Sequence, residues 1–113
     1  MTTRHCFALD LKDDPQLIED YKAHHSAGNV WPEIIESIKS SGIENLDIYL
    51  VGNRLFMIMD VNAEFTFISK EKADLTNPKV IAWEELMWTF QQKLPWAKGD
   101  EKWILMEQIF TLK

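Results

Sequence analysis

Residues 46–61 read LDIYLVGNRLFMIMDV and contain two β-rich runs separated by Gly52-Asn53. A short turn signal between two such runs predicts a β-hairpin, with strands over Leu46–Val51 and Leu55–Val61. Both faces of this hairpin are largely apolar. One face carries Leu46, Ile48, Leu50, Leu55, Met57 and Met59, and the other carries Tyr49, Val51, Phe56 and Ile58. Such a hairpin must be covered on both sides, so helices are expected on one face and a second subunit or a ligand cleft on the other.

The segments on either side of the hairpin predict an α+β fold. Arg4–Lys12 alternates apolar and small or polar residues, which indicates a strand, and Asp13-Asp14-Pro15 then opens a helix. A second helix is expected with Pro32 in its first turn and Gly42 at its end. Beyond the hairpin, helices are predicted over 64–75 and from Asn77-Pro78 to about Lys93, a loop over 96–101 and a last strand over Lys102–Leu112.

This order is β-α-β-β-α-β, because the first two helices act as one bent crossover. It is typical of a ferredoxin-like α+β sandwich, in which a four-stranded antiparallel sheet carries its helices on one face. At 113 residues the chain is expected to form one domain over residues 1–113. The bare sheet face favours a symmetric homodimer in which two sheets meet.

Composition excludes several classes of partner. The net charge of −6 argues against nucleic acid and against an anionic membrane surface, both of which attract clustered Lys and Arg. The single cysteine, Cys6, excludes an internal disulfide and favours a reducing compartment. Neither a signal peptide nor an apolar run of about 18 residues is visible, so the protein is expected to be cytoplasmic.

Tyr21-Lys22-Ala23-His24-His25 contains two of the three histidines in the chain. In a helix, Tyr21 and His25 lie four residues apart on one face, where a phenol and an imidazole form a usable proton-transfer pair. The alternative is that Tyr21 packs in the core and His25 is a solvated helix residue. His24 lies about 100° around the helix from His25.

Other chemistries find less support in the sequence. The histidines show no standard metal spacing, so no metal is expected, and no glycine-rich loop is present to hold a nucleotide. Cys6 lies in a predicted strand without a visible acid–base partner, as inert buried cysteines do. The five tryptophans, at positions 31, 83, 88, 96 and 103, suit core packing, a subunit interface or stacking on a ligand. Trp83 lies on the apolar stripe of its helix, whereas Trp88 points away from that stripe.

The chain resembles the L-rhamnose mutarotase family over nearly its whole length. The resemblance rests on the first strand, the Tyr21-x-x-x-His25 pair, Trp31-Pro32-Glu33, the Ile48-Tyr49-Leu50 strand and the closing Ile109-Phe110. It implies a dimeric α+β barrel and a cofactor-free enzyme that interconverts sugar anomers. It also implies proton transfer by His25 and a sugar pocket that contains Tyr21.

Departures from the family pattern bear on the substrate. Members that act on L-rhamnose usually carry a tyrosine where Leu46 stands, and adjacent paired tryptophans where this chain has Trp83-Glu84-Glu85-Leu86-Met87-Trp88. Residues 7–15, 52–57 and Glu101-Lys102-Trp103 are similar to a branch linked to L-fucose.

The sequence therefore predicts a mutarotase of a deoxyhexose, L-fucose or else L-rhamnose. His25 and Tyr21 are the expected catalytic residues, and Trp83, Trp88, Trp31 and Glu107 are the expected sugar-binding residues. The alternatives are a non-catalytic sugar-binding or regulatory module and another small-molecule enzyme of the same fold, such as a monooxygenase or a lactone isomerase, since fold alone does not fix function.

Overall fold

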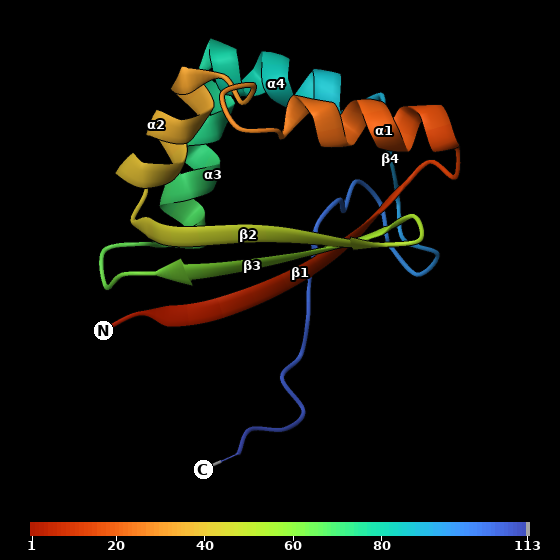
Figure 1. Cartoon of the computed structure of the whole chain (residues 1–113). Coiled ribbons are helices and arrows are strands. Elements are labelled where there is room, and N and C mark those ends of the chain that lie inside the picture. Colours follow the sequence, from red (N-terminus) through yellow and green to blue (C-terminus); the bar gives the residue numbers. More distant parts are fainter. Residues whose placement is uncertain (113) are drawn as a thin grey trace.

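A computed structural model describes residues 1–112 as one antiparallel sheet with four helices on a single face (Figure 1). The elements are β1 (Thr3–Leu11), α1 (Pro15–His24), α2 (Pro32–Ser40), β2 (Ile43–Val51), β3 (Arg54–Val61), α3 (Phe67–Thr76), α4 (Pro78–Trp88), β4 (Gln91–Gln92) and β5 (Ile104–Leu105). This arrangement confirms the predicted α+β class, the antiparallel sheet and the placement of the helices.

The helices begin at the residues that the capping signals indicate. The Asp14 side chain accepts hydrogen bonds from the backbone N–H groups of Gln16 and Leu17, at 2.9 and 3.0 Å, and Pro15 follows it at the first helical position. Asn77 caps α4 in the same way. Such caps satisfy N–H groups that have no partner inside the helix, so they fix where α1 and α4 start.

The sheet has the order β2-β3-β1-β4, and β5 also pairs with β1. β3 occupies one edge of β1 along its length, from Thr3 opposite Val61 to Asp10 opposite Arg54. The other edge is shared by β4 and β5, with Leu11 opposite Gln91 and Phe7 opposite Leu105. The predicted fourth strand is therefore replaced by two short strands on one edge.

The last strand is much shorter than the predicted Lys102–Leu112. Only Ile104 and Leu105 pair with β1, and the Met106 N–H then donates to the Cys6 carbonyl at 2.7 Å. Residues 106–112 leave the sheet on the face opposite the helices and are exposed (Figure 1). A strand needs a partner for its backbone groups, and beyond Met106 the chain has left the edge of β1.

The predicted helix from Asn77 to about Lys93 is also too long. α4 ends at Trp88, and the chain turns at Thr89 and Phe90 so that Gln91 pairs with Leu11. The backbone N–H of Lys12 donates to the Phe90 carbonyl at 2.8 Å, which fastens this turn to the end of β1. Pairing with a distant strand stops the helix here, well before Pro95.

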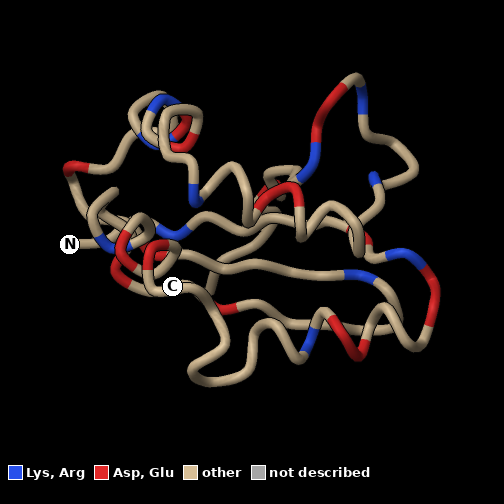
Figure 2. The backbone as a smooth tube through the Cα atoms, turned by 90° about the horizontal axis from the view of Figure 1, so that it is seen from above, with Lys and Arg blue, Asp and Glu red and all other residues tan. Residues whose placement is uncertain are grey.

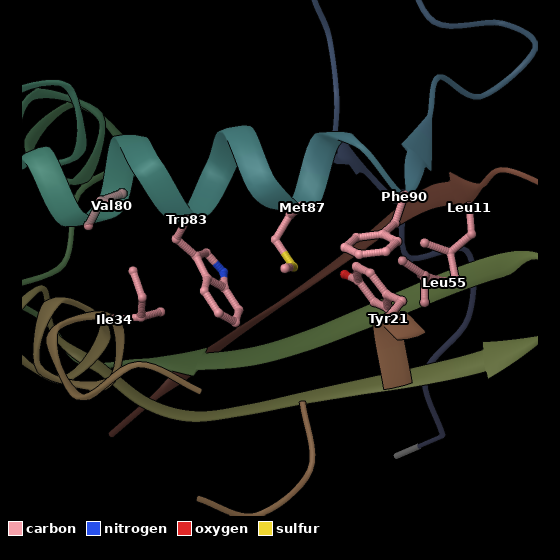
Figure 3. Close-up of a cluster of buried hydrophobic side chains, with 8 residues drawn as sticks. All are labelled: Leu11, Tyr21, Ile34, Leu55, Val80, Trp83, Met87 and Phe90. Atoms are coloured by element: carbon pink, nitrogen blue, oxygen red, sulfur yellow. The ribbon is translucent and has the colours of Figure 1, made fainter. Parts of the chain in front are cut away.

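The main apolar core lies between the helices and the sheet. It is built from the buried side chains of Leu11, Tyr21, Ile34, Leu55, Val80, Trp83, Met87 and Phe90 (Figure 3). A second cluster of Phe7, Ile43, Met59 and Val61 continues it along the sheet. Lys and Arg are scattered over the helices, strands and loops of residues 1–112 and gather on no single element (Figure 2). No helix in that range is long and apolar enough to cross a membrane.

Candidate active site

Tyr21 and His25 lie together at the C-terminal end of α1. Tyr21 is in the last turn of the helix and His25 is its C-cap residue. Their ring centroids are 4.4 Å apart, with 36° between the ring planes. The spacing of four residues therefore brings the phenol and the imidazole into contact, as the sequence predicts.

The tautomer of His25 is fixed by the backbone of α1. Its Nδ1 lies 2.8 Å from the carbonyl oxygen of Tyr21, and since a carbonyl only accepts, Nδ1 carries the proton and donates. In the neutral ring Nε2 then has the free lone pair and is the atom able to accept a proton. Burial lowers the pKa of His25 below its ordinary value of 6.5. The hydrogen bond to the Tyr21 carbonyl raises this pKa by a smaller amount, and the charge of His24 lowers it slightly further. The imidazole is therefore a neutral base at neutral pH.

Tyr21 remains a phenol under the same conditions. It is 4% exposed, and burial raises its pKa from 10.0 to about 12. The charge of Glu84 adds to this rise, whereas the hydrogen bond from Gln91 opposes it. Gln91 Nε2 donates to the Tyr21 hydroxyl oxygen at 3.2 Å, which leaves the hydroxyl proton free for another acceptor.

Trp83 forms an aromatic wall beside the histidine. It projects from α4 toward the sheet (Figure 3), and its ring lies edge-on to His25 at 5.7 Å and 72°. Trp31 also packs edge-on against Trp83, at 5.1 Å and 71°. With 6% of its surface exposed, Trp83 is both a core residue and a wall of the site.

These side chains line a cavity of about 670 Å³ between the helices and the sheet. Its volume falls in the range of about 300–1,000 Å³ that is typical of small-molecule sites. The residues of this cavity that bear on the chemistry are Tyr21, His25, Leu46, Trp83, Gln91 and Trp103. The lining is mostly apolar and also includes charged side chains, among them Lys70, Asp74 and Glu84. The neutral base, phenol and amide beside the Trp83 wall suit a small neutral polyol with an apolar face.

The structure separates the other predicted sugar-binding residues from this cavity. Trp31 packs against Trp83 and is absent from the lining. Trp88 lies on a second hollow of about 570 Å³, outside α4, where the Lys102 ammonium is 5.2 Å from its ring centroid. Glu107 lies on the exposed segment 106–112.

Two cavity residues, Gln91 and Trp103, are not among the site residues that the sequence predicts. Gln91 falls inside the helix that the apolar pattern extends to Lys93, so only its pairing with Leu11 reveals its position. Trp103 stands just before β5 and packs against both apolar clusters. His24 is absent from the lining and its ring lies against Phe90 at 5.3 Å. Within residues 1–112, no three His, Cys, Asp or Glu side chains are grouped closely enough to hold a metal ion.

Comparison with known proteins identifies the family. A family model described as L-rhamnose mutarotase matches residues 4–112. The chain belongs to the L-rhamnose mutarotase family. It is also 41% identical, over 109 residues, to an L-fucose mutarotase of Xanthomonas campestris pv. campestris, an alignment that covers 96% of this chain and 87% of that protein.

Solved structures share the fold of this family member. An L-rhamnose mutarotase from Formosa agariphila superposes with a TM-score of 0.70 at 22% identity, covering 98% of this chain and 99% of that one. The tetracenomycin F2 cyclase of Streptomyces glaucescens superposes with a TM-score of 0.63 at 11% identity, covering 98% and 97%. The second likeness shows that the fold also carries other chemistry, so the reaction has to be argued from the site.

Proposed function

We propose that this protein is a mutarotase that interconverts the α and β anomers of a deoxyhexose, L-fucose in preference to L-rhamnose. The observation that carries the proposal is a neutral His25 on the wall of a cavity large enough for a monosaccharide. Its Nδ1 is bonded to the Tyr21 carbonyl, so Nε2 is free to accept a proton. The family match and the 41% identity to an L-fucose mutarotase support the choice of reaction and of sugar.

Mutarotation requires that one proton leave the anomeric hydroxyl and one arrive at the ring oxygen. In the proposed mechanism, Nε2 of His25 takes the proton of the anomeric hydroxyl while the C1–O5 bond breaks and C1 becomes an aldehyde. The imidazolium returns the proton to O5, which Tyr21 orients by donating its hydroxyl proton in a hydrogen bond. Rotation about C1–C2 and the reverse steps give the other anomer. The balance needs no cofactor, and each positioned proton transfer contributes about 10²–10⁴ in rate.

The walls of the cavity suit a deoxy sugar. Trp83 and Trp103 offer apolar surface to the methyl group and to the C–H face of the ring, and the amide of Gln91 offers polar atoms. Leu46 lies on the same wall and offers no hydrogen-bond partner, which distinguishes this cavity from one with a tyrosine there.

A homodimer is part of the proposal, because the sheet face opposite the helices is apolar in its middle. Register places two ion pairs at the ends of this face, Arg4–Asp60 at 2.9 Å and Arg54–Asp10 at 2.8 Å. The residues between them are the apolar or small Cys6, Ala8, Tyr49, Phe56 and Ile58, together with the exposed carboxylate of Asp47 opposite Ile58. A mostly apolar band, with charges at its ends and one carboxylate at Asp47, favours a second copy of the same sheet packed by two-fold symmetry.

The segment 106–112 adds apolar surface on that side of the sheet (Figure 1). Ile109, Phe110 and Leu112 are 88%, 75% and 86% exposed in the single chain. A partner subunit would bury them together with the sheet face. The free thiol of Cys6 on this face supports a reducing compartment, and we place the enzyme in the cytoplasm.

The decisive experiment is saturation transfer between the two anomeric protons of L-fucose, L-rhamnose and several other sugars. The protein is expected to accelerate exchange of the L-fucose anomers at catalytic concentration. Binding of the sugar without faster exchange would instead show a sugar-binding module. Neither binding nor exchange with any sugar would overturn the proposal.

A further inference from the structure

Gln91 occupies a special position beside the proposed proton-transfer pair. It belongs to β4, and its pairing with Leu11 turns its side chain toward the helices, where it lines the same cavity as His25. The residue is 3% exposed, and its Nε2 donates to the Tyr21 hydroxyl oxygen at 3.2 Å. One half of the amide is therefore used to hold Tyr21.

The other half of the amide has no partner. Among residues 1–112, Gln91 Oε1 is the only fully buried side-chain nitrogen or oxygen without a hydrogen bond. Turning the amide by 180° would pair Oε1 with the Tyr21 hydroxyl and leave Nε2 without a partner instead. Either orientation leaves one buried polar atom unpaired, which costs folding free energy and is uncommon in folded proteins.

We propose that Gln91 is a substrate-binding residue whose free amide atom pairs with a ring hydroxyl of the bound sugar. A hydroxyl both donates and accepts, so it satisfies whichever end of the amide Tyr21 leaves free. The free atom is covered in the empty chain, so the inference requires the side chain to turn toward the cavity that it already lines while the amide keeps its bond to Tyr21. This inference rests on the proposed function and deepens it, because it names the group that recognises the sugar.

The same amide joins recognition to chemistry. In the orientation in which Gln91 Nε2 donates to the Tyr21 oxygen, the Tyr21 proton points to another acceptor, for which the ring oxygen of the sugar is suited. A sugar that pairs with the free amide atom fixes the orientation of Gln91 and, through it, of Tyr21. Gln91 thus binds one hydroxyl directly and positions the phenol.

The test combines substitutions with sugars that lack one hydroxyl. Gln91→Met removes both polar atoms at nearly constant size, and Gln92→Met is the matched control, since Gln92 is adjacent, exposed and on the opposite sheet face. Exchange is measured for L-fucose and each of its monodeoxy analogues. With the wild-type protein, one analogue is expected to lose about ten-fold or more in kcat/KM, because a buried polar group is left unpaired.

With Gln91→Met, L-fucose itself is expected to lose a similar factor, and the difference between L-fucose and that analogue should disappear. Gln92→Met should retain the wild-type discrimination. A Gln91→Met protein that discriminates among all the analogues as the wild type does would overturn the inference. Gln91→Asn, which withdraws the amide by one methylene, gives the same comparison if the methionine variant does not fold.

A role through Tyr21 alone is separated by repeating the comparison in a Tyr21→Phe protein. If Gln91 binds the sugar, Gln91→Met still raises KM about three-fold or more in this background. If Gln91 only holds the phenol, the second substitution has no effect there, and substrate binding by Gln91 is refuted. Failure of the proposed function is distinguishable, because the wild-type protein would then exchange no sugar at all.

Discussion

The Nδ1 of His25 donates a 2.8 Å hydrogen bond to the backbone carbonyl of Tyr21, one helical turn earlier. This bond sets the tautomer of the base from within the helix that also carries the phenol. Because both residues belong to the end of α1, the relation between the imidazole and the phenol does not depend on the packing of separate elements. The adjacent His24 makes the equivalent bond to the Asp20 carbonyl, also at 2.8 Å, but is not part of the cavity wall.

His25 and His24 therefore form a natural pair of variant and control. We expect His25→Ala to lose about 10²–10⁴ of the enzyme-dependent exchange rate, because the proton-transfer group is removed. His24→Ala should remain within a few-fold of the wild type at neutral pH, since its ring packs against Phe90, bonds to the Asp20 carbonyl and does not line the cavity. Saturation-transfer rates on one sugar at equal protein concentration decide the matter, and the reverse ranking would refute His25 as the base.

The pH profile of kcat/KM should report the buried His25. Because burial lowers its pKa below 6.5, the neutral base persists at mildly acidic pH, and activity should fall only as the pH drops through that lowered value. His24→Ala removes a charge that lowers the His25 pKa, so this variant should move the acid limb to higher pH. An acid limb centred above pH 6.5 in the wild type would contradict the assignment.

The same shift has a consequence for stability. Below pH 6.5 the unfolded chain gains a proton on His25 that the folded chain does not yet bind, so the free energy of unfolding should decrease as the pH falls toward the folded-state pKa. Denaturant titrations over this interval should show a shallower decrease in His25→Ala than in the wild type.

Local signals were sufficient to predict the elements that carry the proton-transfer pair. Each of these signals involves residues close together in the chain. They are the alternation in β1, the Asp14-Pro15 cap and the four-residue spacing of Tyr21 and His25. Gly52 illustrates the same point, since its φ of 60° provides the left-handed turn that joins β2 to β3.

The end of α4 and the position of Gln91 depend on pairing between distant strands, which local sequence patterns do not reveal. The apolar positions of α4 continue at helical spacing through Phe90 and Leu94, so the pattern favours helix where the structure has β4. Gln91 is in a strand and not in α4 because its backbone pairs with Leu11 on the edge of β1, 80 residues earlier in the chain. Tertiary pairing overrides the periodic pattern here, and it is this pairing that places Gln91 beside Tyr21.

Trp83 and Trp88 should differ in their effect on sugar binding. Trp83→Phe removes part of the wall that touches both His25 and Trp31, and we expect KM to rise about two- to twelve-fold, as aromatic contacts of about 0.5–1.5 kcal/mol imply. Trp88→Phe should leave KM unchanged, because Trp88 faces the outer hollow beside Lys102. A larger effect of Trp88→Phe than of Trp83→Phe would place the sugar outside the cavity.

The proposed dimer is tested by a charge on the bare sheet face. The wild-type protein is expected to show about twice the 13.3 kDa chain mass by light scattering. Tyr49→Asp should reduce the mass to that of one chain, because it would bury an unpaired carboxylate between the two sheets. Ile68→Asp is the control: both side chains are exposed in the single chain, at 58% and 69%, but Ile68 lies on α3 in the helix layer. A wild-type monomer at micromolar concentration would contradict the proposal.

Leu46 links the cavity to the choice of sugar. It lies on the helix side of the sheet, opposite Met59 in the β2–β3 register, and lines the cavity that contains His25. Members of the family that act on L-rhamnose usually carry a tyrosine at this position, and leucine offers no hydroxyl partner. We therefore expect the wild-type protein to exchange the anomers of L-fucose faster than those of L-rhamnose at equal concentration.

Leu46→Tyr should shift this preference. One regained hydrogen bond is worth about 0.5–1.5 kcal/mol, so the ratio of L-rhamnose to L-fucose exchange should rise about two- to twelve-fold. Leu50→Tyr is the matched control, because Leu50 lies on the same strand and the same sheet face but is absent from the cavity lining. Faster exchange of L-rhamnose than of L-fucose by the wild type would refute the substrate preference and leave the reaction class intact, whereas equal shifts in the two variants would show that Leu46 does not contact the sugar.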